Sequence, residues 1–168
     1  MSVGVLIVGL GQIGMGYDLG LDPAQYVYSH ARAFSQHPDF HLVAAVDPDP
    51  QKRQIFVQSY QCPAYAEIET ALGLHQPGLV VIATPTPLHK ETLQSVLDQS
   101  HPEVVLCEKP LSYDPEEGRL MLTACAEKGT SLFVNYIRRS LPGVVEVKRR
   151  LDAGEFGVPV KEIGRAHV

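Results

Sequence analysis

Cysteine is scarce in this sequence, with three such residues among 168. An odd number of cysteines without C-x-x-C spacing argues against a disulfide framework. Cys107 and Cys125 lie in apolar patterns, and together with Cys62 they indicate reduced thiols in a reducing cytoplasm. The seven histidines also lack metal-ligand spacing, so the sequence predicts no metal site.

Long apolar runs and clusters of positive charge are missing as well. No apolar run approaches the length of a membrane span, and no basic leader precedes the first predicted strand. The net charge is −5, and no basic cluster exists beyond Lys148–Arg150, so the sequence predicts neither a membrane nor a nucleic-acid partner. We therefore expect a cytoplasmic globular domain, as its 45% hydrophobic residues also indicate.

The N-terminal region contains an apolar run that leads directly into G-x-G-x-x-G. The run Val5–Val8 is typical of a strand buried on both faces of a parallel sheet. Gly9 would make the tight turn out of this strand, and Gly11, lacking a Cβ, would let a pyrophosphate approach the backbone. Gly14 would let the next helix pack closely, with its free N–H groups pointing at the phosphate. The motif alone is weak and needs the rest of the dinucleotide fingerprint.

A second apolar run supplies the next part of that fingerprint. His41–Val46 predicts a strand that ends at Asp47, whose carboxylate would accept hydrogen bonds from the adenosine ribose of a dinucleotide. Asp47 follows Gly9 by 38 positions, whereas about 20 is usual. A solvated aspartate capping the next helix is the alternative interpretation. The order of strand, glycines, second strand and aspartate favours the dinucleotide site.

Strands and helices alternate along the rest of the chain, which predicts a doubly wound α/β parallel sheet, the Rossmann architecture. Asp49–Pro50 and Asp114–Pro115 are helix starts, and ligands in such sheets lie at the carboxyl ends of the strands. Further strands are expected at 64–65, 79–83, 104–107 and 132–134, and helices at 29–37, 50–59, 68–75, 115–128 and 144–153, with one more after His89 that carries Leu93, Val96 and Leu97 inward.

The extra spacing is explained by residues 15–29, which interrupt the expected first helix. This segment carries two glycines, a proline and three tyrosines, so we expect a loop. It would lie near the pyrophosphate or the mouth of the cleft. It could be a cofactor lid or a partner contact, although most long loops are neither.

Four stretches together resemble the glucose–fructose oxidoreductase/inositol dehydrogenase (Gfo/Idh/MocA) family of NAD(P)-dependent enzymes. They are Gly9–Gly14, Ala44–Asp49, Ala83–His89 and Cys107–Pro110, and His30 matches the histidine that follows the family's glycine loop. The resemblance covers residues 1 to about 140 and implies an N-terminal cofactor-binding domain. It places these residues at the cofactor: Gly9, Gly11, Gln12, Ile13, Gly14, Asp47, Thr84, Pro85, Thr86, His89, Glu108 and Lys109.

In the family, the lysine of the E-K-P motif lies beside the nicotinamide and the substrate hydroxyl, which implies a catalytic role for Lys109. A lysine at the end of a buried strand is expected to be partly desolvated, which lowers its pKa and helps it deprotonate a carbinol. The alternative is a lysine that merely pairs with Glu108. We expect the cofactor to be NAD rather than NADP, because Asp47 would repel a 2′-phosphate and no arginine directly follows it.

The resemblance also implies a second α/β domain, which in the family supplies most substrate contacts and the homo-oligomer interface. We expect the dinucleotide-binding domain at 1–140, a linking helix and the start of the second domain at 141–161, and at 162–168 a non-native tail that matches a translated sequencing adapter. The second domain is therefore expected to be missing and the fragment inactive.

Two functions remain open on the sequence. The first is the cofactor-binding half of an oxidoreductase that moves hydride to or from a carbinol of a sugar, cyclitol or related polyol. The second is a stand-alone NAD-binding sensor or scaffold. Lys109 favours the first, as do Asn135 and Arg138, which could meet substrate hydroxyls, although an exposed arginine is more often solvated.

Overall fold

The computed structural model describes residues 2–158, and the chain divides into two units after Asn135. Each unit is described by itself. The first unit carries a six-stranded sheet within these residues, in the order β3-β2-β1-β4-β5-β6, and all of the strand pairs are parallel. The strands are β1 (Val3–Val8), β2 (Phe40–Val46), β3 (Ala64–Tyr65), β4 (Leu79–Ile82), β5 (Val104–Cys107) and β6 (Ser131–Val134). The predicted doubly wound parallel sheet is confirmed.

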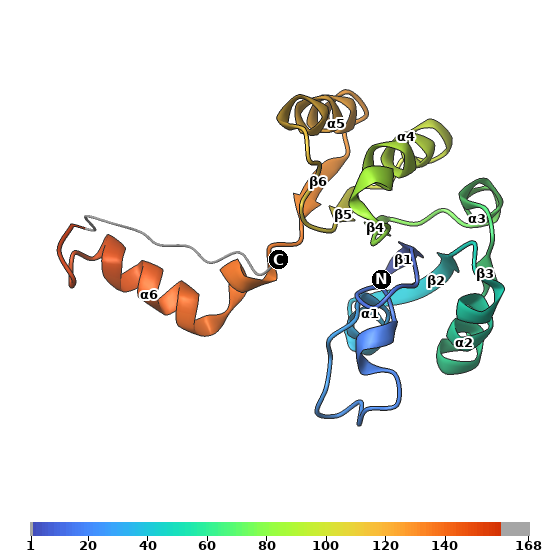
Figure 1. The fold of residues 1–168 in the computed structure, drawn as a ribbon, viewed down its shortest axis with the longest axis horizontal. Coiled ribbons are helices and arrows are strands. Elements are labelled where there is room, and N and C mark those ends of the chain that lie inside the picture. Colours follow the sequence, from blue (N-terminus) through green and yellow to red (C-terminus); the bar gives the residue numbers. More distant parts are fainter. Residues whose placement is uncertain (1, 159–168) are drawn as a thin grey trace. The chain divides into compact units, whose positions relative to one another are not determined.

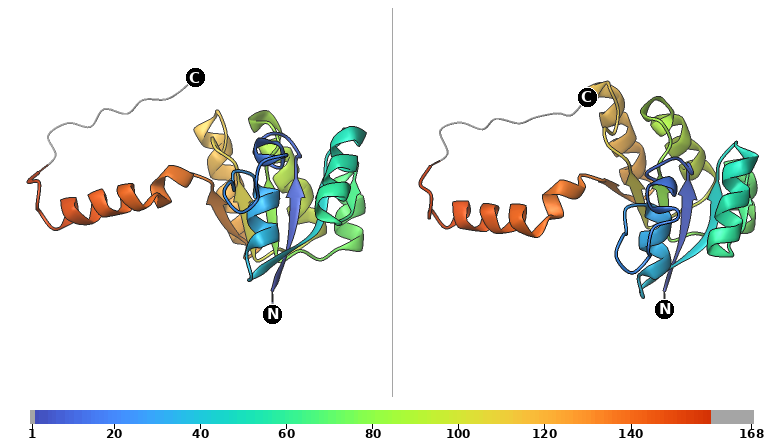
Figure 2. Two further views of the ribbon diagram at one scale, coloured as in Figure 1. Left: turned by 90° about the horizontal axis from the view of Figure 1, so that it is seen from below. Right: turned by 60° about the horizontal axis from the view of Figure 1, so that its bottom comes forward.

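Helices cover both faces of the sheet, as Figures 1 and 2 show. One apolar cluster joins the sheet to α3 (Ile68–Leu74), α4 (His89–Gln99) and α5 (Pro115–Glu127). The other joins it to α1 (His30–Gln36) and α2 (Pro50–Tyr60). All four residues of β4 are buried, because helices cover both faces of this central strand and leave neither exposed to solvent.

Local signals set where three of these helices begin. The side chains of Asp49 and Asp114 accept the backbone N–H groups of Gln51 and Glu116, and a proline follows each cap. Ser29 accepts the N–H of Arg32 in the same way at the start of α1. These side chains satisfy N–H groups that lack a partner within the helix, which is why the caps could be read from the sequence.

The strand order reverses beside β1, which lies between β2 and β4. The connection from β1 to β2 runs through α1 on one face of the sheet, and the connection from β3 to β4 runs through α3 on the other face. The two connections therefore leave a crevice at the carboxyl ends of the strands. The glycine loop follows β1, Asp47 follows β2 and Thr84 lies just beyond β4. The topology thereby brings the predicted cofactor residues to one edge of the sheet.

The second unit contains a short 3-10 helix (Ile137–Ser140) and α6 (Pro142–Asp152). Exposed ion pairs run along α6, between Lys148 and Asp152 at 2.7 Å and between Arg149 and Glu146 at 2.8 Å. Its bounds agree within two residues with the helix expected at 144–153, whereas its role as a link and the start of a second domain stay predictions and the proposed tail 162–168 lies outside the described residues. Among residues 2–158, no helix is long and apolar enough to cross a membrane.

Candidate cofactor-binding site

The three glycines of the loop after β1 have different surroundings. Gly9 has a φ of +99°, and a Cβ there would come within 2.6 Å of the Ala83 carbonyl oxygen. A Cβ at Gly14 would lie 2.0 Å from the carbonyl oxygen of Gly9. A Cβ at Gly11 would meet no atom within 4 Å. Gly9 and Gly14 are therefore required by the fold, whereas Gly11 leaves open space that a ligand can fill.

Residues 15–29 separate the turn of the glycine loop from α1, and two hydrogen bonds join the turn to the start of that helix. The N–H groups of His30 and Ala31 donate to the carbonyls of Ile13 and Gly14, at 2.9 Å each. Each pair is seventeen positions apart where a continuous helix has four, so thirteen residues are inserted. This accounts for most of the excess spacing between Gly9 and Asp47. The segment is mainly a loop, as expected, with a 3-10 helix, η1 (Gly16–Asp18), near its start.

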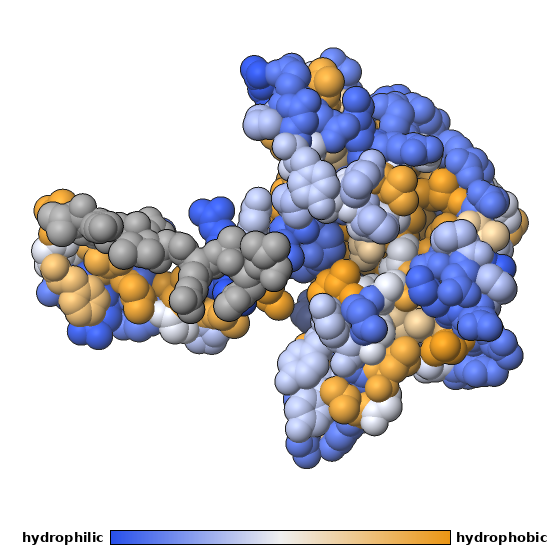
Figure 3. Space-filling model, viewed as in Figure 1, coloured by the Kyte–Doolittle hydropathy of each residue, from blue (hydrophilic) through white to orange (hydrophobic). Residues whose placement is uncertain are grey.

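A cleft of about 600 Å³ opens at the carboxyl edge of the sheet. Figure 3 shows a hollow on this face of the first unit, with apolar side chains in orange beside it. Most of the predicted cofactor residues meet there, but Gly14 and His89 do not line it. Its lining comprises Val8, Gly9, Gly11, Gln12, Ile13, Tyr17, Val46, Asp47, Pro48, Lys52, Ala83, Thr84, Pro85, Thr86, Leu88, Glu108 and Lys109.

Asp47 lies at the adenosine end expected for this cleft and is 5% exposed. Its Oδ2 accepts the Leu10 N–H at 2.8 Å and its Oδ1 accepts the Asp49 N–H at 2.9 Å, which fixes the carboxylate relative to the glycine loop. The guanidinium of Arg53 donates to the carbonyl oxygens of Asp47 and Pro48, so its Nη1 is engaged with backbone. Each Asp47 oxygen keeps acceptor capacity, because a carboxylate oxygen can accept two hydrogen bonds.

Lys52 is a lining residue that the sequence analysis missed. Its ammonium group lies 3.6 Å from Asp47 Oδ2. The lysine occupies the third position of α2, so the register of that helix after its Asp–Pro start was the signal that could have identified it. The Asp47 side chain is buried and that of Lys52 is exposed, so Lys52 places a positive charge beside this carboxylate at the wall of the cleft.

The segment after β4 lines the cleft, and a buried histidine packs beneath it. Thr84 Oγ1 is buried without a hydrogen-bond partner in the described residues, and Thr84 lines the cleft. His89 is 1% exposed, and its ring nitrogens lie 3.0 Å from the Thr84 carbonyl oxygen and 3.1 Å from that of Leu111. His89 therefore supports the cleft wall in this structure, and the direct cofactor contact predicted for it stays a prediction.

Glu108 joins three distant parts of the chain beneath the cleft. Its Oε1 lies 2.8 Å from His30 Nε2 and accepts the amide of Asn135 at 2.6 Å, and its Oε2 accepts the Lys109 backbone N–H at 3.2 Å. Burial raises the pKa of this carboxyl, but the hydrogen bonds from His30 and Asn135 outweigh it and leave the pKa below its ordinary value. Glu108 is therefore ionised at neutral pH, and its carboxylate holds His30 and Asn135 at the end of β5. Asn135, predicted to meet substrate, also orients this carboxylate.

Lys109 lines the cleft, but its side chain is exposed. The expectation that burial would partly desolvate its ammonium group is therefore wrong for this chain. The alternative of a Lys109–Glu108 pair is also not what the structure shows, because Glu108 binds His30 and Asn135. Within residues 2–158 the ammonium group of Lys109 makes no hydrogen bond or ion pair, so it is available to a ligand.

Arg138, the other residue predicted to meet substrate, lies in the 3-10 helix of the second unit, and its role stays a prediction. The three cysteines are free and buried. Burial raises the pKa of the Cys107 thiol to about 12, with smaller contributions from Glu108 and Cys125, so this thiol is not a nucleophile at neutral pH. Among the described residues, no group of three or more potential ligands could hold a metal ion.

The donor set of the cleft fits a dinucleotide. Gly11 leaves backbone open where a pyrophosphate would approach, Asp47 offers acceptors for ribose hydroxyls, and Thr84 offers a buried hydroxyl without a partner. The tyrosine at position 17 reaches the same cleft from the insertion. These residues could hold the cofactor without rearrangement of the sheet.

Comparison with known proteins agrees with this geometry. A family model described as "Oxidoreductase family, NAD-binding Rossmann fold" matches residues 3–136. The inositol 2-dehydrogenase of Rhizobium meliloti is 30% identical over 130 residues, which are 76% of this chain and 38% of that protein. A 2,7-anhydro-N-acetylneuraminate hydratase of Escherichia coli is 25% identical over 152 residues, 90% of this chain and 37% of that protein.

Among solved structures, the WlbA dehydrogenase of Bordetella pertussis, crystallised with NADH and UDP-GlcNAcA, superposes with a TM-score of 0.79 at 26% identity. The match covers 94% of this chain and 44% of that one. The chain therefore spans about two fifths of the length of these relatives.

Proposed function

The chain belongs to the glucose–fructose oxidoreductase/inositol dehydrogenase family, whose NAD-binding Rossmann domain it contains, and from this premise we propose its role. We propose that it is the cofactor-binding part of an NAD-dependent oxidoreductase that acts on a carbinol of a sugar, cyclitol or related polyol. Inositol dehydrogenases among its relatives, and a similar dehydrogenase crystallised with NADH and UDP-GlcNAcA, support this substrate class.

The observation that carries the proposal is the ammonium group of Lys109 at the wall of the cleft, which has no hydrogen-bond or ion-pair partner among residues 2–158. Bound NAD would accept or supply the hydride. In the oxidation direction the hydroxyl proton would pass to water at the open cleft as the hydride leaves the carbon, and Lys109 would donate a hydrogen bond to the substrate oxygen and stabilise the negative charge that develops there. Glu108 holds the backbone N–H of Lys109, and His30 and Asn135 hold Glu108, so the strand end that carries the lysine is fixed. A module that only binds NAD has no need of such a lysine.

Substitution of Lys109 by alanine tests this role. Because the side chain is exposed and its ammonium group makes no hydrogen bond or ion pair within residues 2–158, Lys109→Ala should leave the fold and the NAD affinity of the 168-residue chain unchanged, as titration calorimetry would measure. In the protein at the full length encoded by its gene, the same change should lower kcat with its sugar or polyol by about 100-fold or more.

The alternative function gives a different outcome. A sensor or scaffold would bind NAD but produce no NADH, followed at 340 nm, with any member of a panel of cyclitols and sugars at full length. Loss of NAD binding in Lys109→Ala would also contradict the proposal, because it would place the lysine on the cofactor side. We further propose that the 168-residue chain alone does not turn over substrate, that the full-length protein is a homo-oligomer and that it works in the cytoplasm, in keeping with its free thiols.

A further inference from the structure

The inserted segment of the first helix begins against the glycine loop. The N–H groups of Met15 and Gly16 donate to the Gly11 carbonyl, at 2.9 and 3.0 Å, and that of Tyr17 donates to the Gln12 carbonyl at 2.9 Å. The backbone of Tyr17 is therefore hydrogen-bonded to the glycine loop, which would contact the pyrophosphate. Tyr17 also lines the cleft and is 56% exposed in this structure.

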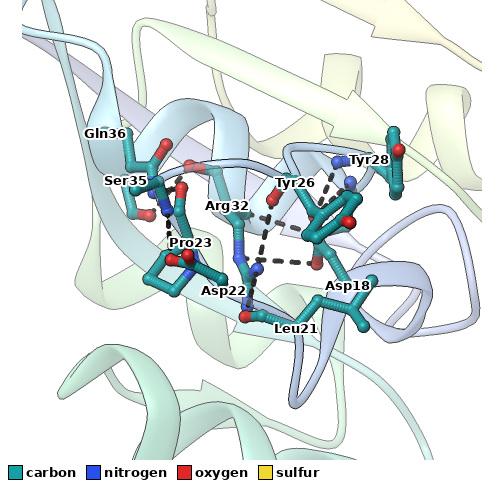
Figure 4. Close-up of polar contacts among 11 residues, drawn as sticks. Asp18, Leu21, Asp22, Pro23, Tyr26, Tyr28, Arg32, Ser35 and Gln36 are labelled. Atoms are coloured by element: carbon teal, nitrogen blue, oxygen red, sulfur yellow. Dashed lines mark hydrogen bonds and ion pairs between the residues drawn. The ribbon is translucent and has the colours of Figure 1, made fainter.

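The residue after Tyr17 is a buried carboxylate that closes the insertion. Asp18 is 0% exposed, and its Oδ2 accepts the N–H groups of Tyr28 and Ser29, at 2.7 and 2.8 Å (Figure 4). Its Oδ1 accepts the Ser29 hydroxyl at 2.6 Å and lies 3.7 Å from Arg32 Nε. The two ends of the inserted segment are therefore joined through one side chain. A buried carboxylate with several donors is costly to displace, so η1 is fixed.

Side chains of α1 hold the far part of the insertion. Arg32 donates to the carbonyls of Leu21 and Tyr26, at 3.0 and 3.1 Å, and Gln36 donates to that of Pro23 at 2.9 Å. Figure 4 shows these contacts around the Arg32 guanidinium. The insertion is therefore held against α1 by side-chain hydrogen bonds, which distinguishes it from an ordinary connecting loop.

We propose that Tyr17 is a cofactor-binding residue supplied by the insertion, and that Asp18 is the residue that positions it. Tyr17 lines the cleft and its backbone is bonded to the glycine loop, so its hydroxyl would donate to a pyrophosphate oxygen and its ring would cover the ligand. The inference rests on the NAD site described above, but not on the substrate or the reaction.

Calorimetric titration with NAD tests the role of Tyr17 in the 168-residue chain. Tyr17→Ala should weaken binding about tenfold, and Tyr17→Phe should weaken it by less, because the ring remains. Tyr28→Ala is the matched control: Tyr28 belongs to the same insertion and is also 56% exposed, but it does not line the cleft. It should bind NAD as the unmodified chain does.

Two smaller ligands locate the contact. ADP carries the pyrophosphate, whereas AMP lacks the second phosphate, so the loss in Tyr17→Ala should persist with ADP and shrink with AMP. If Asp18 acts through Tyr17, then Asp18→Ala should weaken NAD binding on its own but add nothing in the Tyr17→Ala background. Thermal unfolding of each variant shows whether the chain remains folded.

Two outcomes would overturn the proposal. One is a Tyr17→Ala variant that binds NAD as tightly as the unmodified chain, and the other is an equal loss in Tyr28→Ala. Failure of the unmodified chain to bind NAD would reject the cofactor site as a whole, and with it the contact. Normal NAD binding without turnover at full length would reject only the proposed function.

Discussion

Replacement of Gly11 by valine tests the cofactor site most directly. Gly11 lines the cleft, its φ lies outside the region that favours glycine, and a Cβ there meets no atom within 4 Å. The folded chain should therefore tolerate the change to within about 0.5 kcal/mol. The added side chain would occupy the space that the pyrophosphate needs.

The loss of affinity follows from the contacts that would be broken. Hydrogen bonds to a charged group contribute about 1.5–3 kcal/mol each. Displacing the pyrophosphate from the glycine loop should remove one or two of them. A loss of about 3 kcal/mol corresponds to roughly 100-fold weaker binding, since each 1.4 kcal/mol is a factor of ten.

The assay is calorimetric titration of NAD, combined with urea unfolding followed by circular dichroism. Gly14→Ala is the control, because its Cβ would lie 2.0 Å from the Gly9 carbonyl oxygen and force backbone to move. That variant should lose about 3 kcal/mol of stability. The reasoning is refuted if Gly11→Val still binds NAD within about threefold of the unmodified chain, or if it unfolds as readily as Gly14→Ala.

Two further substitutions address Asp47 and Glu108. Asp47→Asn removes the charge but keeps an acceptor oxygen, so the ratio of NADP to NAD affinity should rise; calorimetry with both cofactors checks this, and an unchanged ratio would show that the carboxylate does not select NAD. Glu108→Gln should lower stability at pH 7 by about 1–3 kcal/mol. Because the pKa of Glu108 is below its unfolded value of 4.5, this advantage should be complete above that pH and disappear as the pH falls through the lower folded value. Thermal unfolding of both chains between pH 7 and 3 measures it, and a pH-independent difference would show that the charge of Glu108 is not involved.

Much of the fold was determined by local sequence patterns. The apolar runs that became β1, β2, β4 and β5, the Asp–Pro helix starts and the glycine loop were all readable, because strand burial, capping and backbone freedom depend on residues close in the chain. The cleft residues followed, since parallel strands must bring their carboxyl ends to one edge.

Contacts between distant residues were decided only by the tertiary structure. His30 and Glu108 were each recognisable, but their pairing across 78 positions depends on how α1 and β5 pack. The orientation of His89 toward the Thr84 carbonyl and the exposure of Lys109 were likewise decided by the tertiary structure. So was the burial of Asp18, which fixes a segment that the sequence shows only as a glycine-containing loop. The polarity of residues and their spacing in the sequence do not predict which polar side chain is buried, because burial depends on neighbouring residues that only the folded chain brings together.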